Sequence, residues 1–190
     1  MKEMIKTKIR TVTPDDAPAL LQIYSYYVKN TAISFEYDVP TIDEFRRRIE
    51  HTLLKYPYIA AEDNGKIIGY AYAGPFKERA AYDWAVENTI YVDKDSRGGG
   101  IGKALYLELE NILKKQGILN LNACIAYTEK EDRYLTNGSP EFHKKLGYHT
   151  VGRFSKCGCK FGKWYDMIWM EKLIGEHPDN PSAIIPFTKL

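Results

Sequence analysis

The stretch DSRGGGIGKAL, from Asp95 to Leu105, places four glycines between an apolar run and a segment with helical periodicity. The start of a helix presents main-chain N–H groups without intrahelical acceptors, together with a partial positive charge, and so it favours phosphate. Glycines let the backbone approach such an anion without interference from Cβ atoms. This stretch therefore predicts a phosphate-binding loop at a helix N-terminus.

Three nucleotide-binding patterns could use such a loop, and individual residues distinguish among them. A P-loop needs a glycine where Arg97 stands and a serine or threonine where Ala104 stands. The dinucleotide fingerprint GxGxxG fits Gly98 and Gly100 but fails at Lys103. A third pattern, an Arg or Gln followed by x-x-G-x and a Gly or Ala, is matched in full by RGGGIG at residues 97–102. The residues therefore favour the third pattern.

Hydrophobic periodicity on either side of the loop predicts alternating strands and helices. The run WAVENTIYV at residues 84–92 is a strand before the loop, and the helix after the loop ends at Gly117. Asn64-Gly65 between two aliphatic runs predicts a hairpin with a type I′ turn. Further strands are expected over residues 4–12, 119–127, 148–154 and 164–171, and further helices over residues 14–28, 41–55 and 139–146. This order predicts an α/β or α+β chain with one mixed sheet and a parallel crossover after Trp84.

Composition limits the classes of function. The 190 residues suit one domain with a full core, and 44% hydrophobic with 27% charged residues is ordinary for a globular protein. A formal net charge of +2 gives no reason to expect nucleic acid or membrane binding. The three cysteines form no CxxC pair, which predicts reduced thiols and no metal site. We therefore expect a cytoplasmic protein that binds no metal, no nucleic acid and no membrane.

Residues 97–102 resemble the pyrophosphate-binding loop of the GNAT N-acetyltransferases. A closer resemblance is to the phosphinothricin acetyltransferase family, in the stretches IRTVTPDD, IYSYYVKNTAISFE, GYAYAGPFKERAAYDWAVENTIYV, RGGGIGKALY, FHKKLGYHTVG and KFGKWYDM. The resemblance implies an α/β (α+β) GNAT fold, with a mixed, mostly antiparallel central sheet flanked by helices. It implies an acetyltransferase domain at residues 1–172. The extension at 173–190 would pack on that domain or on a partner subunit.

The resemblance also implies acetyl-CoA as co-substrate and assigns residues to it. The main chain of Ile90, Tyr91 and Val92 would hold the pantetheine arm. Asn137, near the start of a late helix, would also bond that arm. The diphosphate would be held by the loop and the first helical turn, namely Arg97, Gly98, Gly99, Gly100, Ile101, Gly102 and Lys103.

Two residues are candidates for catalysis. Glu87 is a carboxylate within an apolar strand, where it could take a proton from the substrate ammonium; an outward-facing or salt-bridged residue is the alternative. His143, in PEFHKKLGY, matches a family histidine that could act as a second acid or base, or donate to the thiolate sulfur. A place on the helix surface is the alternative for His143.

The acceptor pocket is assigned by resemblance to Phe35, Lys77, Arg79 and Tyr82. Arginine suits a bidentate carboxylate contact, so Lys77 and Arg79 favour an anionic acceptor, with a solvated basic loop as the alternative. Lys160 and Trp164 also match the family, on a strand that completes either the pocket or a dimer contact.

The expected function is transfer of the acetyl group of acetyl-CoA to the amino group of a small amino acid or toxic analogue, of the phosphinothricin or methionine sulfone/sulfoximine type. No cysteine occupies a recognised nucleophile context, which favours direct transfer within a ternary complex. The alternatives are an acetyltransferase for another amine (an antibiotic, a polyamine or a protein N-terminus) and a non-catalytic acyl-CoA sensor. The acidic segment TEKEDRYLTNG and the C-terminal extension differ from the family and leave the acceptor open. A homodimer is expected from the family and from the apolar stretch AIIPF of the tail, with a monomer as the alternative.

Overall fold

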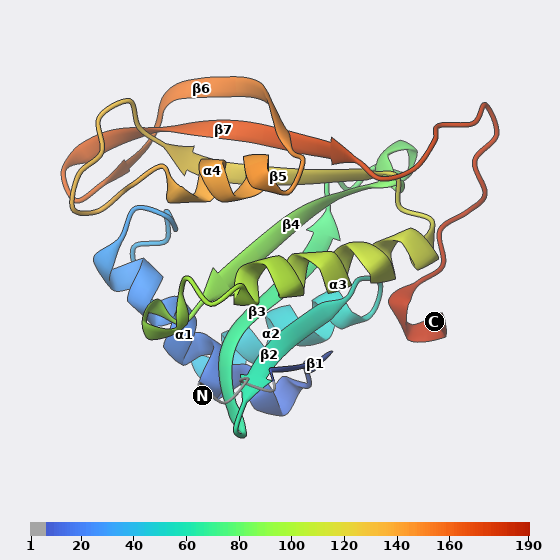
Figure 1. Ribbon diagram of the computed structural model, residues 1–190, viewed down its shortest axis with the longest axis horizontal. Coiled ribbons are helices and arrows are strands. Elements are labelled where there is room, and N and C mark those ends of the chain that lie inside the picture. Colours follow the sequence, from blue (N-terminus) through green and yellow to red (C-terminus); the bar gives the residue numbers. More distant parts are fainter. Residues whose placement is uncertain (1–6) are drawn as a thin grey trace, which may run out of the picture.

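The computed structural model describes residues 7–190 and contains one seven-stranded sheet (Figure 1). The strands follow the order β1-β2-β3-β4-β5-β7-β6 across the sheet. They are β1 (Lys8–Thr11), β2 (Tyr58–Asp63), β3 (Lys66–Pro75), β4 (Ala85–Val92), β5 (Asn120–Tyr127), β6 (His149–Lys160) and β7 (Lys163–Leu173). All neighbouring pairs are antiparallel except β4 and β5. The expected mixed, mostly antiparallel sheet flanked by helices is confirmed.

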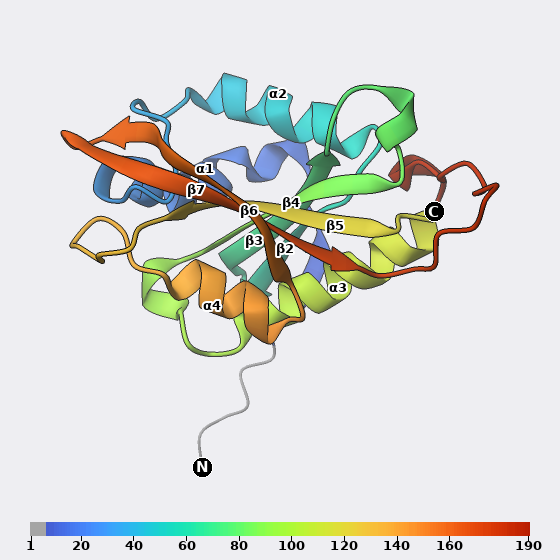
Figure 2. The ribbon, with the colours of Figure 1, turned by 90° about the horizontal axis from the view of Figure 1, so that it is seen from above.

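Four α-helices cover the two faces of this sheet. They are α1 (Ala17–Asn30), α2 (Ile42–Leu53), α3 (Ile101–Gln116) and α4 (Gly138–Lys145). Helices α1 and α2 lie on one face, and α3 and α4 lie on the other (Figure 2). Local sequence determines where they start: the Thr41 hydroxyl caps α2 by accepting from the main-chain N–H of Glu44.

The one parallel pair, β4 with β5, has fewer paired residues than any other pair of neighbouring strands in the sheet. Only Ala85, Val86 and Glu87 pair with β5, opposite Asn120, Leu121 and Asn122. Beyond Glu87 the two strands diverge, which is visible in Figure 1. The divergence opens the middle of the sheet.

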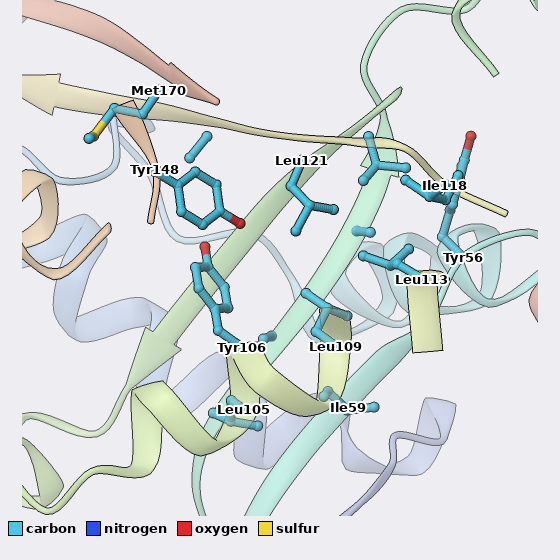
Figure 3. Packing of buried hydrophobic residues seen from close by; sticks show 14 of the residues in the cluster. Tyr56, Ile59, Leu105, Tyr106, Leu109, Leu113, Ile118, Leu121, Tyr148 and Met170 are labelled. Atoms are coloured by element: carbon cyan, nitrogen blue, oxygen red, sulfur yellow. The ribbon is translucent and has the colours of Figure 1, made fainter. Parts of the chain in front are cut away.

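Apolar side chains fill both faces of the sheet. The larger cluster lies under α3, where Leu105, Leu109 and Leu113 are fully buried against β-strand residues such as Leu121 (Figure 3). The cluster under α1 and α2 is rich in tyrosine and includes Tyr70, which has no solvent exposure. Burial on this scale is the main contribution that stabilises the sheet.

Most element predictions agree with the structure, one differs, and one is tested only in part. Asn64 and Gly65 have φ of 49° and 78°, as a type I′ hairpin turn requires. Strand β6 runs to Lys160, six residues beyond the expected end at Phe154, because an irregular register between Phe154 and Gly158 hides its pattern. The first strand was expected over residues 4–12, of which residues 4–6 lie outside the described part.

The C-terminal extension contacts the rest of the chain at several points. Gln116 donates from Nε2 to the carbonyl of Ile185 at 2.7 Å, and the Trp84 indole donates to the carbonyl of Ser182 at 2.8 Å. Ile184 packs against the larger core cluster. The extension therefore lies along the C-terminal end of α3 (Figure 1). Within residues 7–190, no helix has both the length and the apolar character to span a bilayer.

Candidate active site

The divergence of β4 and β5 leaves a cavity of about 430 Å³ in the middle of the sheet. Residues 87–91 of β4 form one wall, and residues 123–126 of β5 form the opposite wall. The segment after α1 contributes residues 33–36, and α4 contributes Ser139 and His143. The topology thus brings four separate parts of the chain to one opening.

Glu87 occupies the vertex of this opening, because it is the last residue of β4 that pairs with β5. The side chain is half-buried and lines the cavity. Removal from water raises the pKa of Glu87, and the positive charge of Lys77 opposes that rise. The carboxylate therefore holds a proton more readily than an exposed glutamate does, which is what a general base for an amine needs.

His143 is 3% exposed, so the alternative of a helix-surface residue is wrong. Its Nδ1 atom lies 2.8 Å from the carbonyl oxygen of Ser139, and its Nε2 atom lies 3.0 Å from the Tyr106 hydroxyl. A carbonyl only accepts, so Nδ1 carries the hydrogen and Nε2 accepts from Tyr106. Burial lowers the pKa of His143 and favours this neutral form.

Tyr106 is a site residue that the sequence did not reveal. It lies on α3, one turn after the glycine loop, and its hydroxyl reaches the cavity beside His143. Figure 3 shows its hydroxyl pointing toward that of Tyr148, which in turn accepts from Asn88 Nδ2 at 3.1 Å. In the RGGGIGKALY stretch this tyrosine has the spacing of a core residue. Its role at the site becomes visible only from the packing of α4 against α3.

The glycine loop has the geometry that a diphosphate requires. Gly98 and Gly100 have φ of 83° and 80°, a region that other residues rarely adopt. The first hydrogen bond of α3 runs from Ala104 N–H to the carbonyl of Gly100, at 3.0 Å. The amides of Ile101, Gly102 and Lys103 therefore have no intrahelical acceptor and are free for an anion.

Arg97 precedes the glycines and is held by aromatic rings. Its guanidinium lies 5.1 Å from the ring centre of Tyr27 and 5.8 Å from that of Tyr26. Arg97 therefore brings a positive charge to the position directly before the glycines. The residues present thus fit a negatively charged diphosphate.

The three main-chain candidates on β4 are not equivalent. Ile90 and Tyr91 line the cavity, so their main chain borders the opening. Val92 instead meets the Tyr27 hydroxyl, which donates to its carbonyl at 2.5 Å and accepts from its N–H at 3.3 Å. A ligand that uses the main chain of Val92 would have to displace Tyr27.

Asn137 lies at the N-cap position of α4, but its side chain already has partners. Its Nδ2 atom donates to the carbonyl of Thr128 at 2.8 Å, and its Oδ1 atom accepts from the Thr128 N–H at 3.5 Å. These bonds attach the start of α4 to the end of β5. A bond from Asn137 to the pantetheine arm stays a prediction.

The four acceptor candidates do not gather at one place. Phe35 lines the main cavity, and Lys77 lies close enough to influence the pKa of Glu87. Tyr82 lines a second cavity, of about 610 Å³, together with Trp84. Arg79 precedes a short 3-10 helix, Ala80–Tyr82, and is exposed.

Cys124 is a second cavity residue that was not predicted. Loss of solvation and the nearby Glu87 carboxylate raise the pKa of Cys124 to about 12. The thiol therefore stays protonated near neutral pH and is a poor nucleophile. A protonated Cys124 is consistent with direct attack by the amine on the thioester. Residues 7–190 contain no group of three or more His, Cys, Asp or Glu side chains that could hold a metal ion.

A diphosphate loop at a helix start, beside an opening between diverging strands with a carboxylate at its vertex, defines a class of acyl-coenzyme A transferases. A profile of the family described as "Acetyltransferase (GNAT) domain" matches residues 9–169. The chain therefore belongs to the GNAT acetyltransferase family and is an acyltransferase.

Comparison with individual proteins agrees with this assignment. The chain is 32% identical to the phosphinothricin N-acetyltransferase of Streptomyces viridochromogenes, over 96% of both chains. It is 30% identical to the L-methionine sulfoximine/L-methionine sulfone acetyltransferase of Pseudomonas aeruginosa PAO1, over 88% of this chain and 94% of the other. A phosphinothricin acetyltransferase from Sinorhizobium meliloti, solved with acetyl-CoA, superposes with a TM-score of 0.86, at 31% identity and over 97% and 98% of the two chains.

Proposed function

We propose that this protein transfers the acetyl group of acetyl-CoA to the amino group of a small amino acid or toxic amino-acid analogue, of the phosphinothricin or methionine sulfone/sulfoximine type. The observation that carries the proposal is the position of Glu87, whose carboxylate lies in the cavity at the point where β4 and β5 separate. The substrates named for the relatives give the acceptor class.

Each part of the site has a task in this reaction. Acetyl-CoA supplies an acetyl thioester, and the amides of residues 101–103 with Arg97 hold its diphosphate. Glu87 removes a proton from the acceptor ammonium, so that a neutral nitrogen attacks the carbonyl carbon. As the C–S bond breaks, the second proton of the nitrogen passes to the departing sulfur, beside the Tyr106 hydroxyl, whose own hydrogen is held by His143 Nε2. Positioning the two reactants can lower the barrier by about 7–11 kcal/mol. A general base contributes roughly 10²–10⁴-fold, or about 3–5 kcal/mol.

The acceptor would be held on the side of the cavity away from the diphosphate loop. Phe35 supplies an apolar wall. Lys77, whose charge acts on Glu87, supplies positive charge for the acceptor carboxylate. The Lys77 ammonium lies over the rings of Phe76 and Trp169, at 5.0 and 5.5 Å from their centres, which limits where its charge can be.

We infer a homodimer in which the face of β5, β6 and β7 that lacks a helix is covered. Val151 and Phe154 on β6 are 51% and 55% exposed, and Tyr82 nearby is 42% exposed. Exposed apolar side chains gathered over one sheet face are typical of an interface. Light scattering after size exclusion tests this, and a monomer at micromolar concentration contradicts it. We further propose a cytoplasmic location and a catalytic domain of residues 1–172 carrying the extension 173–190.

An acceptor panel tests the proposed function. Release of free coenzyme A from acetyl-CoA is followed with phosphinothricin, methionine sulfone and methionine sulfoximine, and in parallel with a polyamine, an aminoglycoside and a peptide with a free N-terminus. We expect transfer to the amino-acid analogues. Transfer only to the other amines would contradict the acceptor class, and binding of acetyl-CoA without any transfer would support a sensor instead.

A further inference from the structure

Lys160 carries a buried positive charge that the reaction described above does not use. The residue is 2% exposed, at the end of β6. Its ammonium donates to two main-chain carbonyls, that of Val28 at 2.8 Å and that of Ser34 at 2.6 Å. Burying a charged group is costly unless hydrogen bonds compensate it, so these two bonds both stabilise the ammonium and hold their carbonyl partners in place.

The two carbonyls belong to consecutive parts of the cavity wall. Val28 lies in the last turn of α1, where carbonyls lack intrahelical donors. Ser34 lies in the segment that follows, immediately before Phe35 and Glu36, which both line the main cavity. We call residues 31–37 the acceptor loop. Lys160 thus connects the end of α1, the acceptor loop and β6 through one side chain.

The two residues before Lys160 hold the same loop. A Cβ atom added to Gly158 would lie 2.3 Å from the Phe35 ring, so that ring rests directly on the glycine. The Tyr37 hydroxyl donates to the carbonyl of Cys159 at 2.5 Å. The end of β6 therefore contacts the acceptor loop at three successive residues, each through a different kind of interaction.

The opposite side of the acceptor loop is also fixed. The N–H of Ala32 donates to the carbonyl of Tyr134 at 2.9 Å. Ala32 also packs in a small buried cluster with Leu135 and Tyr165. The segment after β5 and the end of β6 thus hold the loop from two directions. The Arg48 guanidinium of α2 also holds Glu36 in an ion pair, at 2.7 Å.

We propose that Lys160 is a positioning residue for acceptor recognition, which fixes Phe35 and Glu36 at the cavity wall through its bonds to Val28 and Ser34. This inference rests on the proposed function, because it concerns the acceptor side of the same cavity. The bonds of Lys160 do not reach the diphosphate loop at the start of α3, whose link to this region is the stacking of Arg97 on Tyr27, beside Val28. We therefore expect the main effect on the acceptor.

The test compares Lys160→Met, which keeps the length of the side chain but cannot donate, with Lys160→Arg, which keeps charge and donors. Lys115→Met, on the exposed surface near the end of α3, is the control. We expect Lys160→Met to raise KM for the amino-acid acceptor about tenfold or more, as loss of bonds from a charged donor predicts. KM for acetyl-CoA should stay within about twofold of wild type, and Lys160→Arg should recover much of the loss.

A second pair of variants keeps the inference testable if Lys160→Met does not fold. Gly158→Ala forces the Phe35 ring to move, whereas Gly152→Ala on the same strand meets no atom within 4 Å. Only the first should raise KM for the acceptor. Amide hydrogen exchange of residues 31–37, measured without substrate, should also increase in Lys160→Met and Gly158→Ala.

These outcomes separate the two proposals. An active wild-type enzyme whose acceptor KM is unchanged in Lys160→Met and Gly158→Ala overturns the positioning role and leaves the proposed function intact. Equal increases in both KM values overturn it as well, since they indicate a general structural effect. A wild-type protein without transfer to any amino acid contradicts the proposed function, and unchanged exchange of residues 31–37 in both variants then overturns the inference separately.

Discussion

Replacing Glu87 with glutamine keeps the size of the side chain and removes its ability to take a proton from an ammonium group. The structure indicates that this substitution changes catalysis without breaking other contacts. Among the described residues Glu87 forms no ion pair, and Lys77 is the nearby charge that acts on its pKa. Because burial raises the pKa of Glu87, its charged form is disfavoured in the fold relative to the unfolded chain, and a neutral amide should leave thermal stability unchanged or slightly higher.

The expected effect is on turnover. A well-placed general base contributes roughly 10²–10⁴-fold, so kcat/KM should fall by that factor, which corresponds to about 2.7–5.4 kcal/mol. The wild-type rate should rise with pH as Glu87 loses its proton, above the usual range of a glutamate, and Glu87→Gln should lack this rise. Initial rates of coenzyme A release across pH, with acetyl-CoA binding measured by calorimetry, give both quantities.

Glu50→Gln, at an exposed position of α2, is the matched control and should behave as wild type. A Glu87→Gln enzyme with wild-type kcat/KM and the same dependence on pH would refute the role of Glu87 as general base. Loss of acetyl-CoA binding in that variant would also contradict it, because the diphosphate loop is separate from Glu87.

Three further changes have defined outcomes. Lys77→Ala removes the positive charge that lowers the pKa of Glu87, so the acidic limb of the pH–rate profile should move to higher pH. Gly100→Ala places a Cβ atom at a φ of 80°, which should cost about 1–2 kcal/mol in the free energy of unfolding and weaken acetyl-CoA binding in calorimetry. Gln116→Ala removes a fully buried side chain whose Nε2 donates to two main-chain carbonyls, and it should lower stability by about 1–3 kcal/mol in thermal melts while leaving KM values unchanged.

Patterns along the chain predicted the features that depend on local order. The glycine loop, the helix after it and the Asn64-Gly65 hairpin each follow from backbone chemistry within a few residues. The position of Glu87 within an apolar strand was also visible, because a carboxylate interrupts the pattern there. These signals need no knowledge of the neighbouring strands.

What the sequence did not predict depends on contacts between distant segments. The Tyr27 hydroxyl bonds the main chain of Val92, 65 residues away, and Lys160 bonds Val28 across 132 residues. His143 acquires its partner only when α4 packs beside Tyr106. Such pairs leave no periodicity in the sequence, because each is determined by how the sheet arranges segments that are independent along the chain.

The narrow junction between β4 and β5 has a consequence for the lifetime of the protein. Three residue pairs connect the two halves of the sheet, whereas eight connect β5 to β7. A pantetheine arm lying in the gap would act as a bridge between the halves, so occupancy by coenzyme would hold the protein together as well as supply the reaction. At a hundred times Kd, a bound ligand adds about 2.7 kcal/mol. We therefore expect proteolysis in the cell to quicken when acetyl-CoA and coenzyme A are scarce, which would couple the abundance of this enzyme to the supply of its own co-substrate.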